Sequence, residues 1–105
     1  MNGYENFVIY KIYHPDSPDI FYIGSTKKFG SRKSNHKKNC VNRVSKKYHY
    51  PLYKYIRELG GWDNFKIEIY LKYPCKTKME GLLKEQEVID LLQPKINQIM
   101  AIGKK

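Results

Sequence analysis

The sequence lacks the features that mark several classes of protein. It has no apolar run of transmembrane length and no charged-then-apolar signal at its start, so we expect an intracellular, non-secreted protein, cytoplasmic or nuclear, with no membrane partner. Its two cysteines, Cys40 and Cys75, are isolated and lack metal-ligand spacing, so free thiols are expected, with a disulfide as the alternative. Repeats and low-complexity linkers are absent, and 105 residues are enough for one domain, 1–105, with a single modest core.

Acidic residues are scarce. The chain has 20 Lys and Arg against 10 Asp and Glu, a formal net charge of +10, and the segment Lys27–Lys54 contains no acid at all. Such an excess indicates a polyanionic partner, and the ten tyrosines suit contacts to bases or sugars. Nucleic acid is favoured over an anionic membrane surface, because no basic amphipathic helix with a large apolar face is present. The alternative is a tyrosine-rich core surrounded by solvated lysines.

The hydrophobic pattern predicts six elements in the order β-β-α-α-β-α. β-branched and aromatic residues dominate the expected strands, and apolar residues recur at helical spacing in the last two helices. The turn residues HPDSPD separate the first two strands, which we expect to form a hairpin. The expected elements are Phe7–Tyr13, Ile20–Ser25, Phe29–Lys38, Tyr50–Leu59, Phe65–Leu71 and Lys78–Leu92. This order predicts an α+β fold, in which a small three-stranded antiparallel sheet is flanked by helices.

The spacing of side chains also predicts which residues face one another. We expect the hairpin to pair Ile12 with Ile20 and so to place Tyr10 across from Tyr22. In the last strand, one face is expected to carry Phe65, Ile67, Ile69 and Leu71. In the last helix, the expected buried stripe consists of Met79, Leu82, Leu83, Ile89 and Leu92.

The stretch Phe21–His36, which reads FYIGSTKKFGSRKSNH, combines three side chains suited to handling a phosphodiester: a tyrosine, an arginine and a histidine. Gly24 ends an apolar run, at a point where a side chain would block a close backbone approach or a sharp turn. Arg32 and His36 are four residues apart, so on a helix they share one face. Taken singly, each feature is more often packing or a solvated surface.

One carboxylate occupies an unexpected position. Glu85 follows Leu82 by three residues and precedes Ile89 by four, so it lies within the expected apolar stripe, whereas Glu80 and Glu87 project from the opposite side. A carboxylate that faces a core is costly unless it is paired or bound to a metal. It fits a nuclease site with a single Mg²⁺ held by an oxygen ligand. The alternative is a buried salt bridge to a lysine, or a stripe edge that reaches water.

Taken in order, these residues resemble the GIY-YIG endonuclease superfamily. The first half-motif corresponds to Val8-Ile9-Tyr10, which departs from the family's leading glycine, and the second stands intact as Tyr22-Ile23-Gly24. Eleven residues separate the two tyrosines, and Arg32 follows the glycine by eight residues, as in the family. The closing segment Glu85–Asn97 resembles the family's glutamate helix with its proline and asparagine. The resemblance covers a core of 7–97. It extends to small free-standing members, such as those of mobile elements and of virus or phage genomes, and so mildly favours a stand-alone enzyme.

The resemblance implies a three-stranded sheet and metal-dependent hydrolysis of a DNA phosphodiester by an in-line water. Glu85 would be the only protein ligand of one Mg²⁺ (or Mn²⁺) per active site. Tyr22 would be the general base that acts on the water. Arg32 would bind the scissile phosphate and, together with the metal, lower the pKa of this tyrosine, which is roughly 10 when unperturbed.

Three further residues complete the implied site. Tyr10 would position the water or the second tyrosine, His36 would assist or contact a phosphate, and Asn97 would brace the site. The DNA-facing surface is expected, by charge, mainly over the loop 39–47 and the helix 50–59, where phosphate contacts would make binding weaken steeply with salt. The expected nucleic-acid-binding residues are Lys27, Lys28, Arg32, Lys33, Lys37, Lys38, Arg43, Lys46, Lys47, His49 and Lys54.

An active nuclease is therefore the main hypothesis, with duplex, nicked or branched DNA as its partner. Cutting both strands would require a homodimer or two successive events. The alternative is a non-catalytic basic nucleic-acid-binding module with the same fold, although such a module has no use for an inward glutamate. An accessory interaction protein would leave the charge unexplained. The chain is expected to be either a stand-alone enzyme of low or structure-based specificity, or one domain of a longer protein.

Overall fold

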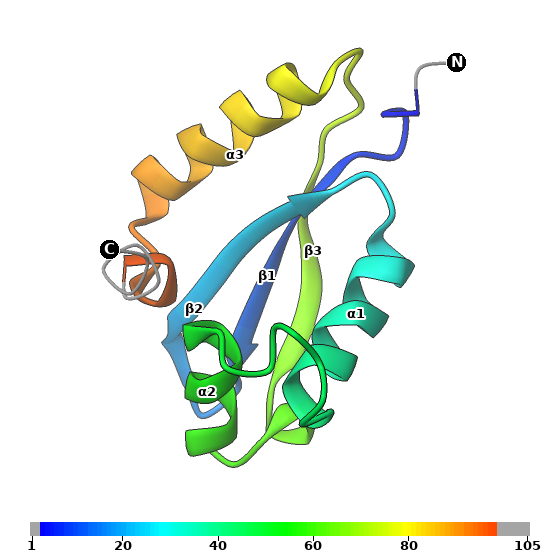
Figure 1. Ribbon diagram of the computed structural model, residues 1–105. Coiled ribbons are helices and arrows are strands. Elements are labelled where there is room, and N and C mark those ends of the chain that lie inside the picture. The colour runs from blue at the N-terminus through cyan, green and yellow to red at the C-terminus, as the bar shows by residue number, and fades with distance from the viewer. Residues whose placement is uncertain (1–2, 99–105) are drawn as a thin grey trace.

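The computed structural model describes residues 3–98, and its strands and helices follow the predicted order (Figure 1). The elements are β1 (Val8–His14), β2 (Ser17–Thr26), α1 (Phe29–Val41), α2 (Pro51–Glu58), the short 3-10 helix η1 (Trp62–Asn64), β3 (Lys66–Lys72) and α3 (Lys78–Leu92). The strands form one antiparallel sheet in the order β2-β1-β3. The predicted α+β fold, a three-stranded antiparallel sheet flanked by helices, is confirmed. The remainder of the predicted domain 1–105 lies outside the described residues.

Helices cover both faces of the sheet, and β1 supplies side chains to the core on each face because they alternate. Tyr10 and Ile12 pack with residues of α1 and α2, whereas Phe7 and Ile9 pack with Val88 of α3. Figure 1 shows α3 on one side of the sheet and α1 with α2 on the other. The edge strand β2 therefore runs between α1 and α3, and its end is reachable from both helices.

The two cysteines belong to these different cores. Cys40 is buried among the residues of α1 and α2, and Cys75 is buried near α3. Both are free thiols, as predicted.

Within residues 3–98, no helix combines the length and the apolar character needed to cross a membrane.

The hairpin register differs from the prediction by two residues. The observed pairs include Ile12 with Tyr22 and Tyr10 with Gly24, where the predicted pairs were Ile12 with Ile20 and Tyr10 with Tyr22. The connection is shorter than HPDSPD suggested, because Pro18 lies within β2. An edge strand tolerates a residue without a backbone N–H. The two tyrosines remain diagonal neighbours, with ring centroids 6.4 Å apart.

Gly24 does not end its strand, since β2 continues to Thr26. Its missing side chain serves a close approach rather than a sharp turn. A Cβ at Gly24 would lie 2.5 Å from the hydroxyl oxygen of Tyr10 and 2.6 Å from its Cζ. The phenol of Tyr10 thus occupies the space that a side chain on the paired strand would fill.

The predicted facing of β3 is wrong at one end. A register shift between Ile9 and Tyr10 in the pairing with β3 interrupts the alternation. Ile67 packs on the core beneath α1 and α2, whereas Leu71 packs on the core beneath α3. Separately, α1 extends to Val41, so the loop expected at 39–47 begins inside the helix.

The buried stripe of α3 is rotated relative to the predicted one. Three residues expected to be buried are exposed: Met79 (63%), Leu82 (41%) and Leu83 (63%). Gly81 and Val88 are the buried residues of this helix. Gly81 permits a close contact, because a Cβ there would overlap the ring of Phe7. Glu85 lies between the two buried positions and is half-buried, so the predicted placement of this carboxylate on the buried stripe holds.

Candidate functional site

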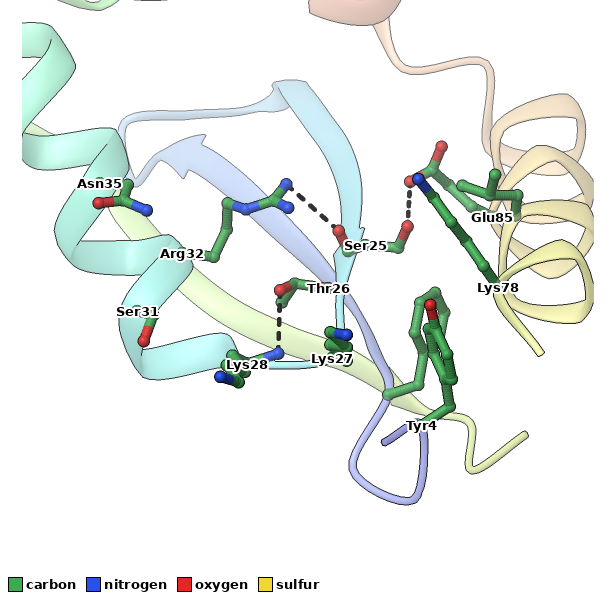
Figure 2. Close-up of a pocket in the computed structure, with 12 residues that line it drawn as sticks. Tyr4, Ser25, Thr26, Lys27, Lys28, Ser31, Arg32, Asn35, Lys78 and Glu85 are labelled. Atoms are coloured by element: carbon green, nitrogen blue, oxygen red, sulfur yellow. Dashed lines mark hydrogen bonds between the residues drawn. The ribbon is translucent and has the colours of Figure 1, made fainter. Parts of the chain in front are cut away.

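A pocket of about 500 Å³ opens where β2 ends, between α1 and α3 (Figure 2). Figure 2 shows Arg32 reaching into it from α1, Glu85 facing it from α3, and Ser25 at the end of β2 between them. The charged side chains that line it are Lys27, Lys28, Arg32, Lys78 and Glu85. Four cations surround a single carboxylate, so the pocket suits an anion that is bound together with a cation.

Ser25 connects the two predicted site residues on either side of it. Its hydroxyl donates a hydrogen bond to Oε1 of Glu85, and its carbonyl oxygen accepts one from Nη1 of Arg32 at 3.4 Å. Sequence reasoning missed Ser25 as a site residue. The available signal was its position directly after Tyr22-Ile23-Gly24, at the end of the strand.

A second pocket, of about 510 Å³, contains the predicted residues Tyr22 and His36. Arg32 and Asn35 line both pockets, so the two cavities adjoin at the face of α1 that carries these residues. The predicted catalytic residues are thus divided. Glu85 faces the first pocket, Tyr22 and His36 face the second, and Arg32 lies between them.

Burial raises the pKa of the hydroxyl groups of Tyr10 and Tyr22. Tyr10 is fully buried, and burial raises the pKa of its hydroxyl to about 12, with the nearby Arg32 charge only partly opposing it. The pKa of Tyr22 is raised further, first by burial and then by the neighbouring Tyr10 and Glu85, while Arg32 again opposes. Arg32 acts in the predicted direction, but its effect is smaller than that of burial. The side chain of Tyr10 has no surface exposed to solvent.

His36 is held by two tyrosine hydroxyls. Its Nε2 lies 2.7 Å from the hydroxyl of Tyr10 and its Nδ1 lies 2.8 Å from that of Tyr53, on α2. Burial, followed by the charges of Arg32 and Lys47, lowers the pKa of His36 to about 4, so the ring is neutral at physiological pH. A direct phosphate contact, one of its two expected roles, would require one of these hydrogen bonds to break. Tyr53, which sequence reasoning missed, is thereby linked to the site.

Asn97 braces the outer edge of β2. Its Oδ1 accepts from the backbone N–H of Ile23 at 2.7 Å, and its Nδ2 donates to the carbonyl oxygen of Ile23 at 2.9 Å. Because β2 is an edge strand, these backbone groups have no strand partner on that side. Asn97 supplies both missing hydrogen bonds to β2. The role that the resemblance implies for it, bracing the site, stays a prediction.

The residues of the first pocket fit a hard divalent cation. Glu85 and Ser25 offer a carboxylate and a hydroxyl, both oxygen donors. Within residues 3–98 no cluster of three His, Cys, Asp or Glu could hold a metal ion, so water and phosphate oxygens would have to supply the other ligands. Mg²⁺ is characteristically held by one or two carboxylates, with water and phosphate oxygens completing its shell. A single carboxylate in the same pocket as an arginine is compatible with that mode.

The predicted DNA-binding residues are all exposed but are not all together. Lys27 and Lys28 join Arg32 in the first pocket, and Lys47 joins it in the second. The remaining residues line neither of these pockets: Lys33, Lys37, Lys38, Arg43, Lys46, His49 and Lys54.

A pocket with four cations and one carboxylate, on a small helix-flanked sheet, has a charge arrangement that suits a phosphate group bound together with a cation. The family model of the GIY-YIG catalytic domain matches residues 6–97, and the chain therefore belongs to the GIY-YIG family. No curated protein and no solved structure matches the chain significantly.

Family membership indicates an endonuclease, a hydrolase that acts on DNA, and such nucleases generally depend on a divalent metal. The homodimer considered for double-strand cleavage has no support in the family match or in the described part of the chain.

Proposed function

We propose that this chain is a divalent-metal-dependent DNA endonuclease in which Glu85 holds the metal and Arg32 binds the scissile phosphate. The observation that carries the proposal is the convergence of these two side chains, from helices on opposite sides of the sheet, on one pocket at the end of β2. A binding module would need only the cations. The half-buried carboxylate has a use when a cation is bound beside it.

Each residue of the first pocket has a distinct role in the proposal. The guanidinium of Arg32 presents a planar fork that suits two oxygens of a phosphate. Lys27 and Lys28 hold the flanking phosphates. Glu85, assisted by the hydroxyl of Ser25, would hold one Mg²⁺ or Mn²⁺. The bound ion would stabilise negative charge on the phosphate and on the leaving oxygen.

Tyr22 is the proposed acceptor of the proton from the attacking water. Because burial and the charge of Glu85 raise its pKa, its hydroxyl is protonated at neutral pH before a cation binds. A cation bound to Glu85 would cancel the contribution of that carboxylate to the raised pKa of Tyr22. Tyr10 packs against Tyr22 and His36 holds Tyr10, so both orient the phenol without reacting. This arrangement predicts that cleavage accelerates as pH rises above neutrality.

The experiment that tests the proposal is plasmid nicking with Mg²⁺ or Mn²⁺ at low salt. Glu85→Gln keeps the shape of the side chain but removes its charge, and it should reduce nicking by at least about 100-fold while DNA binding survives. The matched control is Glu87→Gln, on the same helix, whose carboxylate is exposed and pairs only with Lys84 in the described structure. The control should nick like the parent.

Two outcomes would contradict the proposal. Binding without cleavage by the parent, on plasmid and on branched DNA with either metal, would favour the alternative of a non-catalytic basic nucleic-acid-binding module. Equal nicking by the parent and Glu85→Gln would mean that Glu85 does not hold the metal, or that a contaminating nuclease is being measured.

A further inference from the structure

The second pocket differs in chemistry from the first. The first is lined by four cations and a carboxylate, with Tyr4 and Phe7 beside them. The second is lined by the rings of Tyr22, Tyr50 and Tyr53 and by two cations, Arg32 and Lys47. No acidic residue lines it. Cations suffice for a phosphate, but clustered aromatic rings are what proteins use to stack unpaired bases.

Tyr50 is placed as a stacking platform. Its ring lies 6.4 Å from that of Tyr53, at an interplanar angle of 20°. Tyr53 is buried, and its hydroxyl contacts His36 at 2.8 Å, so it supports Tyr50 from within the protein. Tyr50 itself is 46% exposed, and Nζ of Lys47 lies 5.9 Å from its ring centroid. A supported aromatic ring thus stays accessible at the rim of the pocket.

Amide groups are also available there. Asn35 is exposed, lines both pockets, and forms no side-chain hydrogen bond in the described structure. Asn39 is more constrained, since its Oδ1 accepts from Ser45 at 2.6 Å. A side-chain amide offers a donor and an acceptor together, as the edge of a base does. The pocket therefore offers both stacking and edge contacts.

We infer that the second pocket binds one unpaired nucleobase, that of a nucleotide next to the scissile phosphate. The inference rests on the proposed function, because it takes Arg32, which lies between the pockets, as the phosphate-binding residue. A nucleotide attached to that phosphate would place its base against Tyr50. A base that is still paired and stacked in a duplex cannot enter, so the preferred substrate carries an unpaired nucleotide at the cut site, as flapped or branched DNA does.

The test combines changes in the protein and in the DNA. Binding is measured with Glu85→Gln protein, to prevent cleavage, on flapped DNA in which single nucleotides beside the mapped cut site are replaced by abasic residues. Tyr50→Leu removes the ring, and Tyr50→Phe is the matched control that keeps it. Removing a stacking ring weakens binding by roughly 5- to 100-fold, so we expect a loss in that range for Tyr50→Leu and no loss for Tyr50→Phe.

The decisive measurement combines Tyr50→Leu with the abasic DNA. If Tyr50 contacts the base, Tyr50→Leu and the abasic residue should cost no more together than either does alone. The inference would be overturned if the losses of affinity from Tyr50→Leu and from the abasic residue multiplied at every position beside the cut. It would also be overturned if Tyr50→Leu weakened binding to a fully paired duplex by the same factor. Asn35→Ala provides a second variant, at an exposed position, and should weaken binding to the intact flap but not to the abasic one.

Failure of the inference can be told from failure of the proposed function. If the parent cleaves DNA in a Glu85-dependent manner but cuts duplex and flap equally well, the endonuclease stands and the base pocket is wrong. If the parent cleaves nothing, the endonuclease itself is wrong. A thermal unfolding scan of each Tyr50 variant shows whether a loss of binding reflects a loss of folding.

Discussion

The missing side chain of Gly24 leaves room for Tyr10, one of the two motif tyrosines. The phenol of Tyr10 lies where a Cβ at Gly24 would project, 2.5 Å from the hydroxyl oxygen. Tyr10 is fully buried and cannot move aside without disturbing the core of α1 and α2. The second half-motif therefore requires glycine for packing against the first half-motif, rather than for a turn.

Gly24→Ala is expected to destabilise the fold by about 1–3 kcal/mol, the usual cost of overpacking, and to reduce nicking because the added Cβ would displace the rings of Tyr10 and Tyr22. Denaturant unfolding and plasmid nicking measure the two effects. Gly30→Ala is the control, since a Cβ there meets nothing within 4 Å, and it should leave stability unchanged or raise it by about 0.5–1 kcal/mol. A Gly24→Ala protein as stable and active as the parent would refute the packing argument.

His36 makes stability depend on pH. Its pKa is lowered to about 4 in the folded protein, because burial and the charges of Arg32 and Lys47 disfavour the protonated ring. In the unfolded chain the pKa of His36 is near 6.5, so between about pH 6.5 and pH 4 the unfolded chain binds a proton at His36 that the folded chain does not. Stability is therefore fully present above about pH 6.5 and falls as pH is lowered toward 4, by about 1.4 kcal/mol per unit of pKa difference and on the order of 3 kcal/mol in total.

Urea unfolding at pH 7 and at pH 4.5 measures this dependence. His36→Gln should be less stable at pH 7, since it loses the tyrosine contacts, but should show a shallower decline in acid. His49→Gln, at an exposed histidine, should decline like the parent. Parallel declines for the parent and His36→Gln would show that carboxylates alone cause the acid sensitivity.

At the scale of elements, α2 anchors the basic loop 42–50 through Arg57, a residue that the sequence did not single out. Its Nη1 donates to the carbonyl oxygen of Cys40 at 2.9 Å and its Nη2 donates to that of Tyr48 at 2.7 Å. The guanidinium also stacks on Tyr48, with Cζ 3.6 Å from the ring centroid. Arg57 thus joins the end of α1, the loop and α2, and holds Lys47 and Tyr50 near the second pocket.

Arg57→Lys keeps the charge but loses the forked geometry. We expect a loss of stability of about 1–3 kcal/mol and weaker DNA binding, because the loop is no longer held. Lys54→Gln, on the same helix, removes a charge from an exposed position and should leave stability within about 0.5 kcal/mol of the parent. The stabilising role of Arg57 would be disproved if Arg57→Lys unfolded at the same denaturant concentration as the parent.

At the scale of the whole molecule, a net charge of +10 and the cations around both pockets predict salt-dependent DNA binding. The logarithm of the binding constant should fall linearly with the logarithm of the salt concentration. Lys28→Gln, in the first pocket, should reduce the slope by about 0.9, the value for one phosphate contact on duplex DNA. Lys66→Gln, at the hairpin end of the sheet opposite Tyr13, should leave the slope unchanged, and fluorescence anisotropy titrations at several salt concentrations compare the two. Binding that is insensitive to salt would contradict this electrostatic account.

The amino-acid sequence by itself determined the order of the elements, the position of Glu85 on the buried stripe of α3, and the ordered motif residues of the family. These are local patterns. Residues three or four apart share a helix face, and alternating residues share a strand face, whatever the rest of the chain does. The helix Lys78–Leu92 matches its predicted bounds because its ends are locally encoded. Thr77 accepts a hydrogen bond from the backbone N–H of Glu80 at the start, and Pro94 follows the last helical residue by two positions.

Only the tertiary structure decided the hairpin register, the face of α3 that packs, and the connection from Tyr10 through His36 to Tyr53. Pro18 looked like a turn residue because local chemistry does not reveal that its strand lies at an edge. Leu82 and Leu83 looked buried because apolar spacing does not reveal that the ring of Phe7 fits only against Gly81. The burial that raises the pKa values of Tyr10 and Tyr22 likewise comes from packing between segments far apart in sequence. Each of these depends on which surfaces meet, and that is settled by packing between distant segments.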